Sequence, residues 1–142
     1  MGKKKYTGER LETHESGQGM LEHLHRYGVA LEFCRHKDVL DIASGEGYGS
    51  NLLAKVARNI TGVDISADTV REASEKYATR QKNLQFIEGS AAAIPAKAAS
   101  FDVVVSFETI EHHDKHEEMM AEIKRVLRPG GMLIISSPDK LY

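Results

Sequence analysis

Short apolar runs alternate along this chain with longer stretches in which apolar residues recur every three or four positions. The runs are rich in Val, Ile and Leu, which is typical of strands buried on both faces, and the longer stretches are typical of amphipathic helices. Strands are expected at residues 38–43, 59–65, 84–87, 101–107 and 132–136. Helices are expected at residues 18–33, at 50–58, after the N-cap candidate Ser66, and along the apolar stripe at 119–127.

This order of elements predicts an α/β fold: a Rossmann-like, doubly wound and mostly parallel sheet with helices on both faces. The 142 residues, 41% of them hydrophobic, are enough for one core, so we expect a single domain. We divide it into an N-terminal arm and helix (residues 1–36) and a cofactor-binding core (residues 37–142). Ligands of such sheets bind beyond the carboxyl ends of the strands.

Composition and charge argue against several classes of protein. The formal net charge of −2 disfavours a general nucleic-acid binder, which needs a strongly basic face. Cys34 is the only cysteine, so the chain has no internal disulfide and no Cys-rich zinc site. No apolar run approaches the ~20 residues that span a bilayer, and no secretory signal is recognised. We therefore expect a cytoplasmic protein without a membrane span.

The candidate chemistry begins at a glycine-rich turn, GEGYG at residues 45–49, between the first strand and the next helix. Glycines allow sharp backbone turns and a close approach of ligand to main chain. Asp64, about 20 residues onward at the tip of the second strand, can accept the two ribose hydroxyls of an adenosine group. Two cofactors fit this arrangement, a nicotinamide dinucleotide and S-adenosylmethionine.

Charge separates the two cofactors. Asp41 directly precedes the loop. A carboxylate repels a pyrophosphate but attracts the ammonium and sulfonium groups of S-adenosylmethionine. The spacing GxGxG also differs from the GxGxxG that brings a pyrophosphate onto a helix N-terminus. We therefore favour S-adenosylmethionine and keep a nicotinamide-dependent oxidoreductase as the alternative.

Four segments resemble successive motifs of the class I S-adenosylmethionine-dependent methyltransferases, in particular the type 11 group: VLDIASGEGYG, GVDIS, EGSAAAIPAKAASFDVVVSFETIEHH and RVLRPGGMLIISSP. They cover residues 37–138 in the family's order. The resemblance implies an enzyme that uses S-adenosyl-L-methionine and releases S-adenosyl-L-homocysteine. The expected acceptor is a small molecule or saccharide, methylated at oxygen.

The resemblance also assigns residues to parts of the cofactor. It implies that the loop holds the methionine part, the acid after the second strand the ribose, and its neighbour the adenine. The loop after the third strand meets the adenine edge, and the end of the fourth strand closes the pocket near the methyl group. The implied cofactor-binding residues are Asp41, Ala43, Ser44, Gly45, Gly47, Asp64, Ile65, Ser90, Ala91, Ser106, Phe107 and Glu108.

Two positions depart from the family's pattern. Ala43 replaces the first glycine of the loop, a mild change if its backbone keeps a negative φ. Ser90 stands where the family often has an acid for the adenine amino group. That contact is then weaker, mediated by water, or made by the Ser90 hydroxyl.

The N-terminal arm and first helix resemble a methyltransferase subgroup found beside glycosyltransferases in bacterial surface-polysaccharide synthesis. A helix before the first strand can cover the cofactor, with Arg26 available for its carboxylate and Tyr27 for stacking. The alternative is that Arg26 is a solvated charge and Tyr27 a core residue.

His112 is the candidate catalytic residue. It follows the fourth strand, and the unperturbed pKa of a histidine, ~6.5, suits a general base that deprotonates a hydroxyl. The alternative is a helix-capping or surface histidine. His113 is adjacent and would point elsewhere, so we expect no metal cluster in this segment.

The chain ends at Tyr142, soon after the fifth strand, whereas the family's sheet usually has seven strands. An apolar strand at the edge of a sheet is an aggregation hazard unless it is covered. We therefore expect either a chain truncated after the fifth strand or a homodimer that covers this edge. A non-catalytic S-adenosylmethionine-binding module is the remaining alternative.

Overall fold

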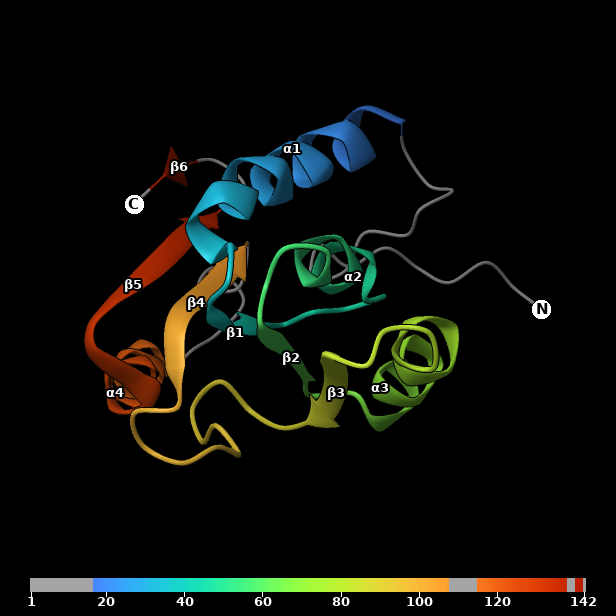
Figure 1. Ribbon diagram of the computed structural model, residues 1–142. Coiled ribbons are helices and arrows are strands. Elements are labelled where there is room, and N and C mark those ends of the chain that lie inside the picture. The colour runs from blue at the N-terminus through green and yellow to red at the C-terminus, as the bar shows by residue number, and fades with distance from the viewer. Residues whose placement is uncertain (1–16, 108–114, 138–139, 142) are drawn as a thin grey trace.

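The computed structural model describes residues 17–107, 115–137 and 140–141 (Figure 1). In chain order the elements are α1 (Gly17–Cys34), β1 (Asp38–Ile42), α2 (Tyr48–Ala54), β2 (Asn59–Asp64), α3 (Ala67–Ala73), the π-helical turn η1 (Ser74–Ala78), β3 (Leu84–Glu88), β4 (Phe101–Phe107), α4 (His116–Val126), β5 (Leu127–Ser137) and β6 (Lys140–Leu141).

The strands form one sheet in the order β3-β2-β1-β4-β5-β6. The neighbouring pairs from β3 to β5 are parallel, as expected for a doubly wound fold. From β1 the chain proceeds outward through β2 to β3 and then returns to the other side of β1 to form β4 and β5. The strand order therefore reverses between β1 and β4, and a ligand crevice is expected at the carboxyl ends of these two strands.

The fifth strand is not the last one in the sheet. The two-residue strand β6 pairs antiparallel with its end, Ser136 with Leu141 and Ser137 with Lys140. The parallel part of the sheet thus has the five expected strands, and β6 adds a short antiparallel pair beyond them.

Helices cover both faces of the sheet (Figure 1), because neighbouring residues of each strand point in opposite directions. Side chains of α1, α2 and α3 pack against one face, where Val39 and Val105 are buried. Met119 and Ile123 of α4 pack against the other face, where Leu40 is buried. Two apolar cores thus fix the central strands β1 and β4.

The helix α2 begins and ends earlier than its apolar spacing predicts. Gly47, with φ of 94°, is its N-cap, so the helix begins at Tyr48. At the other end, the Asn83 side chain donates to the carbonyls of Ala54 and Ala57 at 2.8 and 3.1 Å. Asn83 thus satisfies carbonyls that the end of the helix leaves without an intrahelical partner, and residues 55–58 can turn toward β2.

Two other element boundaries also show local causes. The Ser66 hydroxyl accepts the Thr69 N–H at 3.2 Å, which confirms Ser66 as the N-cap of α3. The strand β5 begins at Leu127, before the expected residue 132, because Leu127 already pairs with Phe101. The register then shifts, so the Pro-Gly-Gly segment lies within the strand as an irregularity.

Candidate functional site

The loop between β1 and α2 has an unusual share of left-handed backbone. Ala43, Gly45 and Gly47 have φ values of 59°, 58° and 94°. The N–H of Ser44 donates to the Val63 carbonyl at 3.0 Å, which ties the loop to the end of β2. The loop is therefore sharply folded and anchored at the carboxyl edge of the sheet.

Ala43 does not meet the condition under which its replacement of glycine would be mild. Its φ is positive, in a region where a Cβ approaches the following carbonyl oxygen and costs about 1–2 kcal/mol. The conformation persists because the N–H of the next residue is paired with β2. Backbone strain is thus stored at the entrance of the loop.

Asp41 lies beneath this loop and is fully buried. Its carboxylate accepts the Ser50 hydroxyl at 2.7 Å and the Tyr27 hydroxyl at 3.0 and 3.2 Å. Three segments, α1, β1 and α2, therefore meet at one buried charge. Burial, and to a lesser extent the charge of Asp41, raises the pKa of the Cys34 thiol to about 12.

Tyr27 is a core residue, the second of the two interpretations that the sequence allowed. Its side chain is 3% exposed and contacts Phe107 edge-on, with ring centroids 4.9 Å apart. A stacking role over the cofactor is therefore not what the structure shows. The ring instead lies directly against Gly49, where a Cβ would overlap it.

Asp64 connects the loop to the start of α3. One carboxylate oxygen accepts the Gly45 N–H at 2.9 Å, and the other accepts the Ser66 N–H at 3.0 Å. Each oxygen of a carboxylate can accept about two hydrogen bonds, so both keep acceptor capacity. The side chain is half-buried at the end of β2, with Ile65 beside it 71% exposed.

The segment after β3 reaches the same edge of the sheet. The Gly89 N–H donates to the Asp64 carbonyl at 2.9 Å. The Ser90 hydroxyl accepts the Ala92 N–H at 3.0 Å, which leaves its own hydrogen for another partner. Ala91 is buried below. The backbone bond between Gly89 and Asp64 therefore brings the next residues, Ser90 and Ala91, close to the end of β2.

The end of β4 carries a buried hydroxyl. Ser106 is fully buried and lies opposite Ile42 in the β1–β4 register. In the part of the chain that the structure describes, its hydroxyl and that of Ser44 have no hydrogen-bond partner. Buried polar atoms of this kind call for a ligand or water. Phe107 is buried as well, on the α1 face of the sheet.

Three further predicted residues can be placed only in part. Arg26 is half-buried on α1. Glu108 and His112 lie outside the described residues. Within the described ranges, no group of three or more His, Cys, Asp and Glu side chains could hold a metal ion.

Comparison with known proteins agrees with this geometry. The model of a methyltransferase domain family matches residues 40–135. A probable S-adenosylmethionine-dependent methyltransferase of Mycolicibacterium smegmatis is 39% identical over 108 residues, which are 76% of this chain and 40% of that protein. The chain belongs to the class I S-adenosylmethionine-dependent methyltransferases. S-adenosylmethionine is the methyl donor of this family.

Two other proteins widen the comparison. A fatty-acid O-methyltransferase of the same organism is 28% identical over 85% of this chain and 47% of its own length. The crystal structure of the PH0226 protein of Pyrococcus horikoshii superposes with a TM-score of 0.74, at 31% identity, over 85% of this chain and 58% of that one. The chain thus spans less than half the length of the two curated relatives from Mycolicibacterium smegmatis. None of its described helices is both long and apolar enough to cross a bilayer.

The described residues fit the cofactor of the chain's family. Asp64 has acceptor capacity for ribose hydroxyls, and the backbone of residues 43–47 turns sharply beside it. The buried hydroxyls of Ser44 and Ser106 lack protein partners among the described residues. Asp41 is fully buried, and its carboxylate accepts the hydroxyls of Tyr27 and Ser50.

Ser50 is a site residue that sequence reasoning missed. From the first turn of α2, its hydroxyl donates to Asp41 at 2.7 Å. A signal was present, because a serine directly after a glycine-rich turn can face back toward the preceding strand. The partner of Tyr27 could not be found in this way, since it depends on how α1 packs.

Proposed function

We propose that this chain transfers the methyl group of S-adenosylmethionine to an oxygen of a small molecule or saccharide. The observation that carries the proposal is Asp64. Its carboxylate is fixed by two backbone N–H groups, at 2.9 and 3.0 Å, and still has acceptor positions at the carboxyl edge of the sheet. A carboxylate held in this way is suited to a pair of ribose hydroxyls.

The remaining assignments follow the edge of the sheet. The backbone of Ala43 to Gly47, with Ser44 and Gly45, would hold the methionine part, and Arg26 its carboxylate. Ile65 would cover the adenine, whose edge would meet Ser90 and Ala91. The end of β4, with Ser106, Phe107 and Glu108, would lie near the methyl group. Asp41 would favour the positive charges of the ligand through the low-dielectric interior.

When bound, S-adenosylmethionine supplies a methyl group that its sulfonium already activates. The residues of the chain then have to bring the acceptor oxygen into line with that methyl group and exclude water, and orientation of this kind lowers the barrier by several kcal/mol, about 7–11 at most. An acceptor hydroxyl must also lose its proton. We assign His112 as the base that accepts it.

The choice of acceptor has two supports. One relative is named a fatty-acid O-methyltransferase, which favours oxygen as the target. The N-terminal segment resembles methyltransferases of surface-polysaccharide synthesis, which favours a saccharide. A panel of lipid and saccharide hydroxyls therefore forms the first screen for methyl transfer.

Calorimetric titration tests the cofactor site. We expect S-adenosylmethionine to bind and NAD not to bind. Asp64→Ala should weaken S-adenosylmethionine binding more than tenfold, about 1.4 kcal/mol. The matched control is Asp68→Ala, which removes an exposed carboxylate that pairs with Arg71 in α3. Equal affinity of Asp64→Ala and wild type would remove Asp64 from the site, and binding of NAD alone would overturn the proposed function.

The pH profile of kcat/KM tests His112. His112→Asn should lower kcat/KM by a factor of about 10²–10⁴ and abolish the loss of activity toward acid that a histidine base produces. His113→Asn is the control, with an unchanged profile expected. A His112→Asn enzyme with the wild-type profile would exclude the base role.

We also propose that a second copy of the chain covers the outer edge of β5 and that the protein works in the cytoplasm. Among the described residues, only the last two of β5 pair with β6, and Met132 is 41% exposed. The buried, protonated Cys34 is compatible with a reducing compartment. Light scattering after size-exclusion chromatography should give a dimer, and a well-behaved monomer would refute the first proposal.

A further inference from the structure

The segment that follows β3 is held by a helix that is distant in the sequence. Residues 89–97 lead away from the carboxyl end of β3 and carry Ser90 and Ala91. Two residues of α4, Glu122 and Arg125, bond to the backbone of this segment some 30 residues earlier in the chain. We call residues 89–97 the nucleobase loop.

Glu122 and Arg125 act on the loop as one unit. They lie one turn apart on α4 and form a two-pronged ion pair, with N–O distances of 2.7 and 2.8 Å. Glu122 accepts the Ile94 N–H at 2.8 Å, and Arg125 donates to the Ile94 carbonyl at 2.9 Å. A second guanidinium nitrogen donates to the Ala96 carbonyl at 2.8 Å. Three backbone groups of the loop are thus fixed by one pair of side chains.

The contacts are of the strong kind and are partly shielded from water. Ion-pair hydrogen bonds with two-pronged geometry combine charge with directional specificity. The side chains of Glu122 and Arg125 are 21% and 37% exposed. Arg125, together with the Ile94 N–H, holds the pKa of Glu122 below its usual range. The pair therefore stays charged at neutral pH.

Contacts within the nucleobase loop connect Ile94 to Ser90 and Ala91. Ile94 is 4% exposed and packs in the core on the α4 face together with Ala91. Pro95 folds back onto Gly89, where a Cβ would meet the proline ring. The Ala93 N–H closes the turn by donating to the Ser90 carbonyl at 3.0 Å. Displacement of Ile94 would therefore shift Ser90 and Ala91.

We infer that Glu122 and Arg125 are positioning residues for cofactor binding, which hold the nucleobase loop so that Ser90 and Ala91 meet the adenine edge. The inference rests on the proposed function for the identity of the ligand. Neither side chain needs to touch the cofactor. Their effect is on the conformation of a loop whose polar groups must be in place before the ligand arrives.

The test combines a binding measurement with a local one. The variants are Arg125→Gln, which removes both backbone contacts of the guanidinium, and Arg125→Lys, which keeps the charge but not the fork. The control is Arg71→Gln in α3, which removes an exposed i,i+3 pair with Asp68 that holds no loop. S-adenosylhomocysteine is titrated by calorimetry, and amide hydrogen exchange is followed at Ile94 and in β1.

We expect Arg125→Gln to weaken S-adenosylhomocysteine binding about tenfold and to speed exchange at the Ile94 amide, with β1 unchanged. Arg125→Lys should lie between Arg125→Gln and wild type, and Arg71→Gln should match wild type. Unchanged affinity in a folded Arg125→Gln protein would overturn the inference. So would a weakening accompanied by equally faster exchange in β1, because that pattern indicates general loss of structure. If the wild-type protein does not bind S-adenosylhomocysteine, the proposed function fails instead. Faster exchange at the Ile94 amide of Arg125→Gln, with β1 unchanged, would still show that Arg125 holds the nucleobase loop.

Discussion

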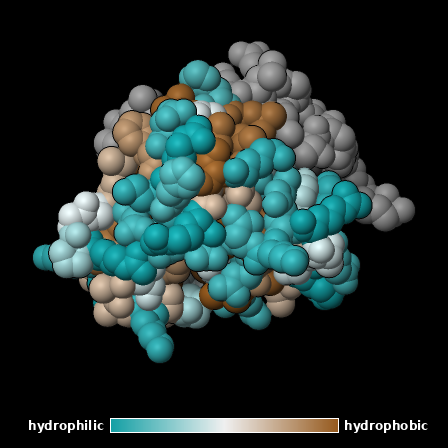
Figure 2. All heavy atoms as spheres, viewed as in Figure 1, coloured by the Kyte–Doolittle hydropathy of each residue, from teal (hydrophilic) through white to brown (hydrophobic). Residues whose placement is uncertain are grey.

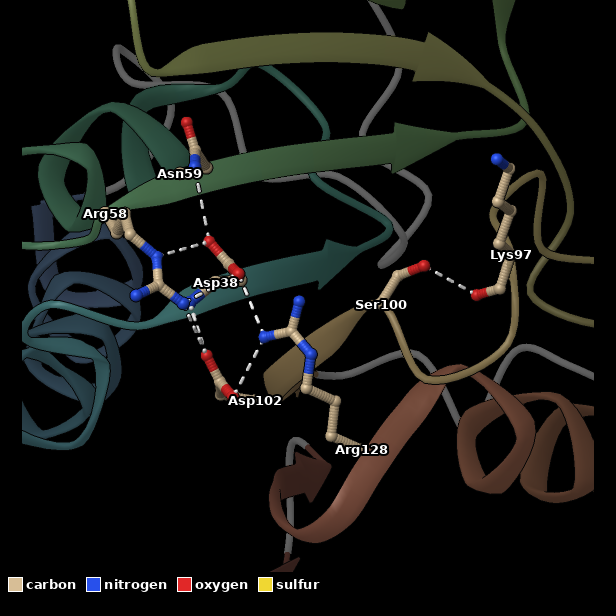
Figure 3. A network of polar contacts seen from close by, with 7 residues as sticks. All are labelled: Asp38, Arg58, Asn59, Lys97, Ser100, Asp102 and Arg128. Carbon is tan, nitrogen blue, oxygen red and sulfur yellow. Dashed lines mark hydrogen bonds and ion pairs between the residues drawn. The ribbon is translucent and has the colours of Figure 1, made fainter.

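The two ends of the parallel sheet are organised in opposite ways. At the amino end, Asp38 of β1 and Asp102 of β4 lie among two arginines and Asn59 (Figure 3). Arg58 bonds Asp38 at 2.9 and 3.1 Å, and Arg128 reaches both carboxylates at 2.9 and 3.0 Å. Both carboxylates are thus paired with groups of the chain itself.

The carboxyl end is left incomplete. Asp64 retains acceptor positions, two buried hydroxyls lack partners among the described residues, and the apolar Ile65 is exposed. Three residues of the β1–α2 loop have left-handed backbone, one of them an alanine. The amino end thus stabilises the sheet, whereas the carboxyl end retains strain and unmet hydrogen bonds that a ligand can satisfy.

One face of the molecule carries mainly polar side chains. Figure 2 shows a mainly hydrophilic face, with hydrophobic residues gathered toward the top, in the region of α1. Val29 and Phe33, four residues apart on α1, are 54% and 47% exposed. A small group of exposed apolar side chains of this kind is common on protein surfaces. The contrast between the ends of the sheet is therefore the feature that carries functional information.

The largest effect is expected at the support of the carboxyl end. Gly49→Val would place side-chain atoms inside the ring of Tyr27, which is also bonded to Asp41. We expect a loss of unfolding free energy of about 3 kcal/mol or more, measured by urea denaturation. Gly28→Ala in α1 is the matched control, because its Cβ would meet no atom within 4 Å. A Gly49→Val protein as stable as wild type would show that Tyr27 does not fix the loop.

An intermediate effect is expected at the amino end and depends on pH. The pKa of Asp38 is lowered chiefly by its hydrogen bond from Arg58, and that of Asp102 chiefly by the backbone N–H of Asp38. A lowered pKa in the folded state contributes stability above the unfolded pKa, about 4, and this contribution is lost as the pH falls further. The melting temperature should therefore fall steeply below about pH 4.

The arginine variants sharpen this result. Arg58→Gln should be less stable than wild type at pH 7 and should lose less stability on acidification, because one source of the lowered pKa is gone. Arg71→Gln, which removes an exposed i,i+3 pair, should shift the whole pH profile by very little. Parallel profiles for wild type and Arg58→Gln would contradict the assignment.

The sequence predicted the strands of the sheet but not the side-chain contacts that join distant elements, and the reason is physical. Strand 101–107 is confirmed at both ends, because continuous apolar residues report burial in a parallel sheet locally. The role of Tyr27 depended on a hydroxyl reaching a carboxylate 14 residues away, which only the packing of α1 decides. The nucleobase loop is similar, since Arg125 bonds Ile94 and Ala96 across the fold. Periodicity carries no information on such contacts.

The smallest effect is expected at Ala43, and its sign is informative. Glycine would relieve the left-handed strain of about 1–2 kcal/mol but would cost about 0.5–1 kcal/mol in chain entropy. Ala43→Gly should therefore raise the unfolding free energy by up to about 1 kcal/mol, or the melting temperature by about 2–4 °C. Ala121→Gly, in the exposed middle of α4, should lower it by a similar amount. If both substitutions destabilise equally, Ala43 is unstrained in solution. If they differ as expected, the backbone at Ala43 is strained, at the position where the family normally has the first glycine of the loop. The affinity of Ala43→Gly for S-adenosylmethionine then measures how this strain influences cofactor binding.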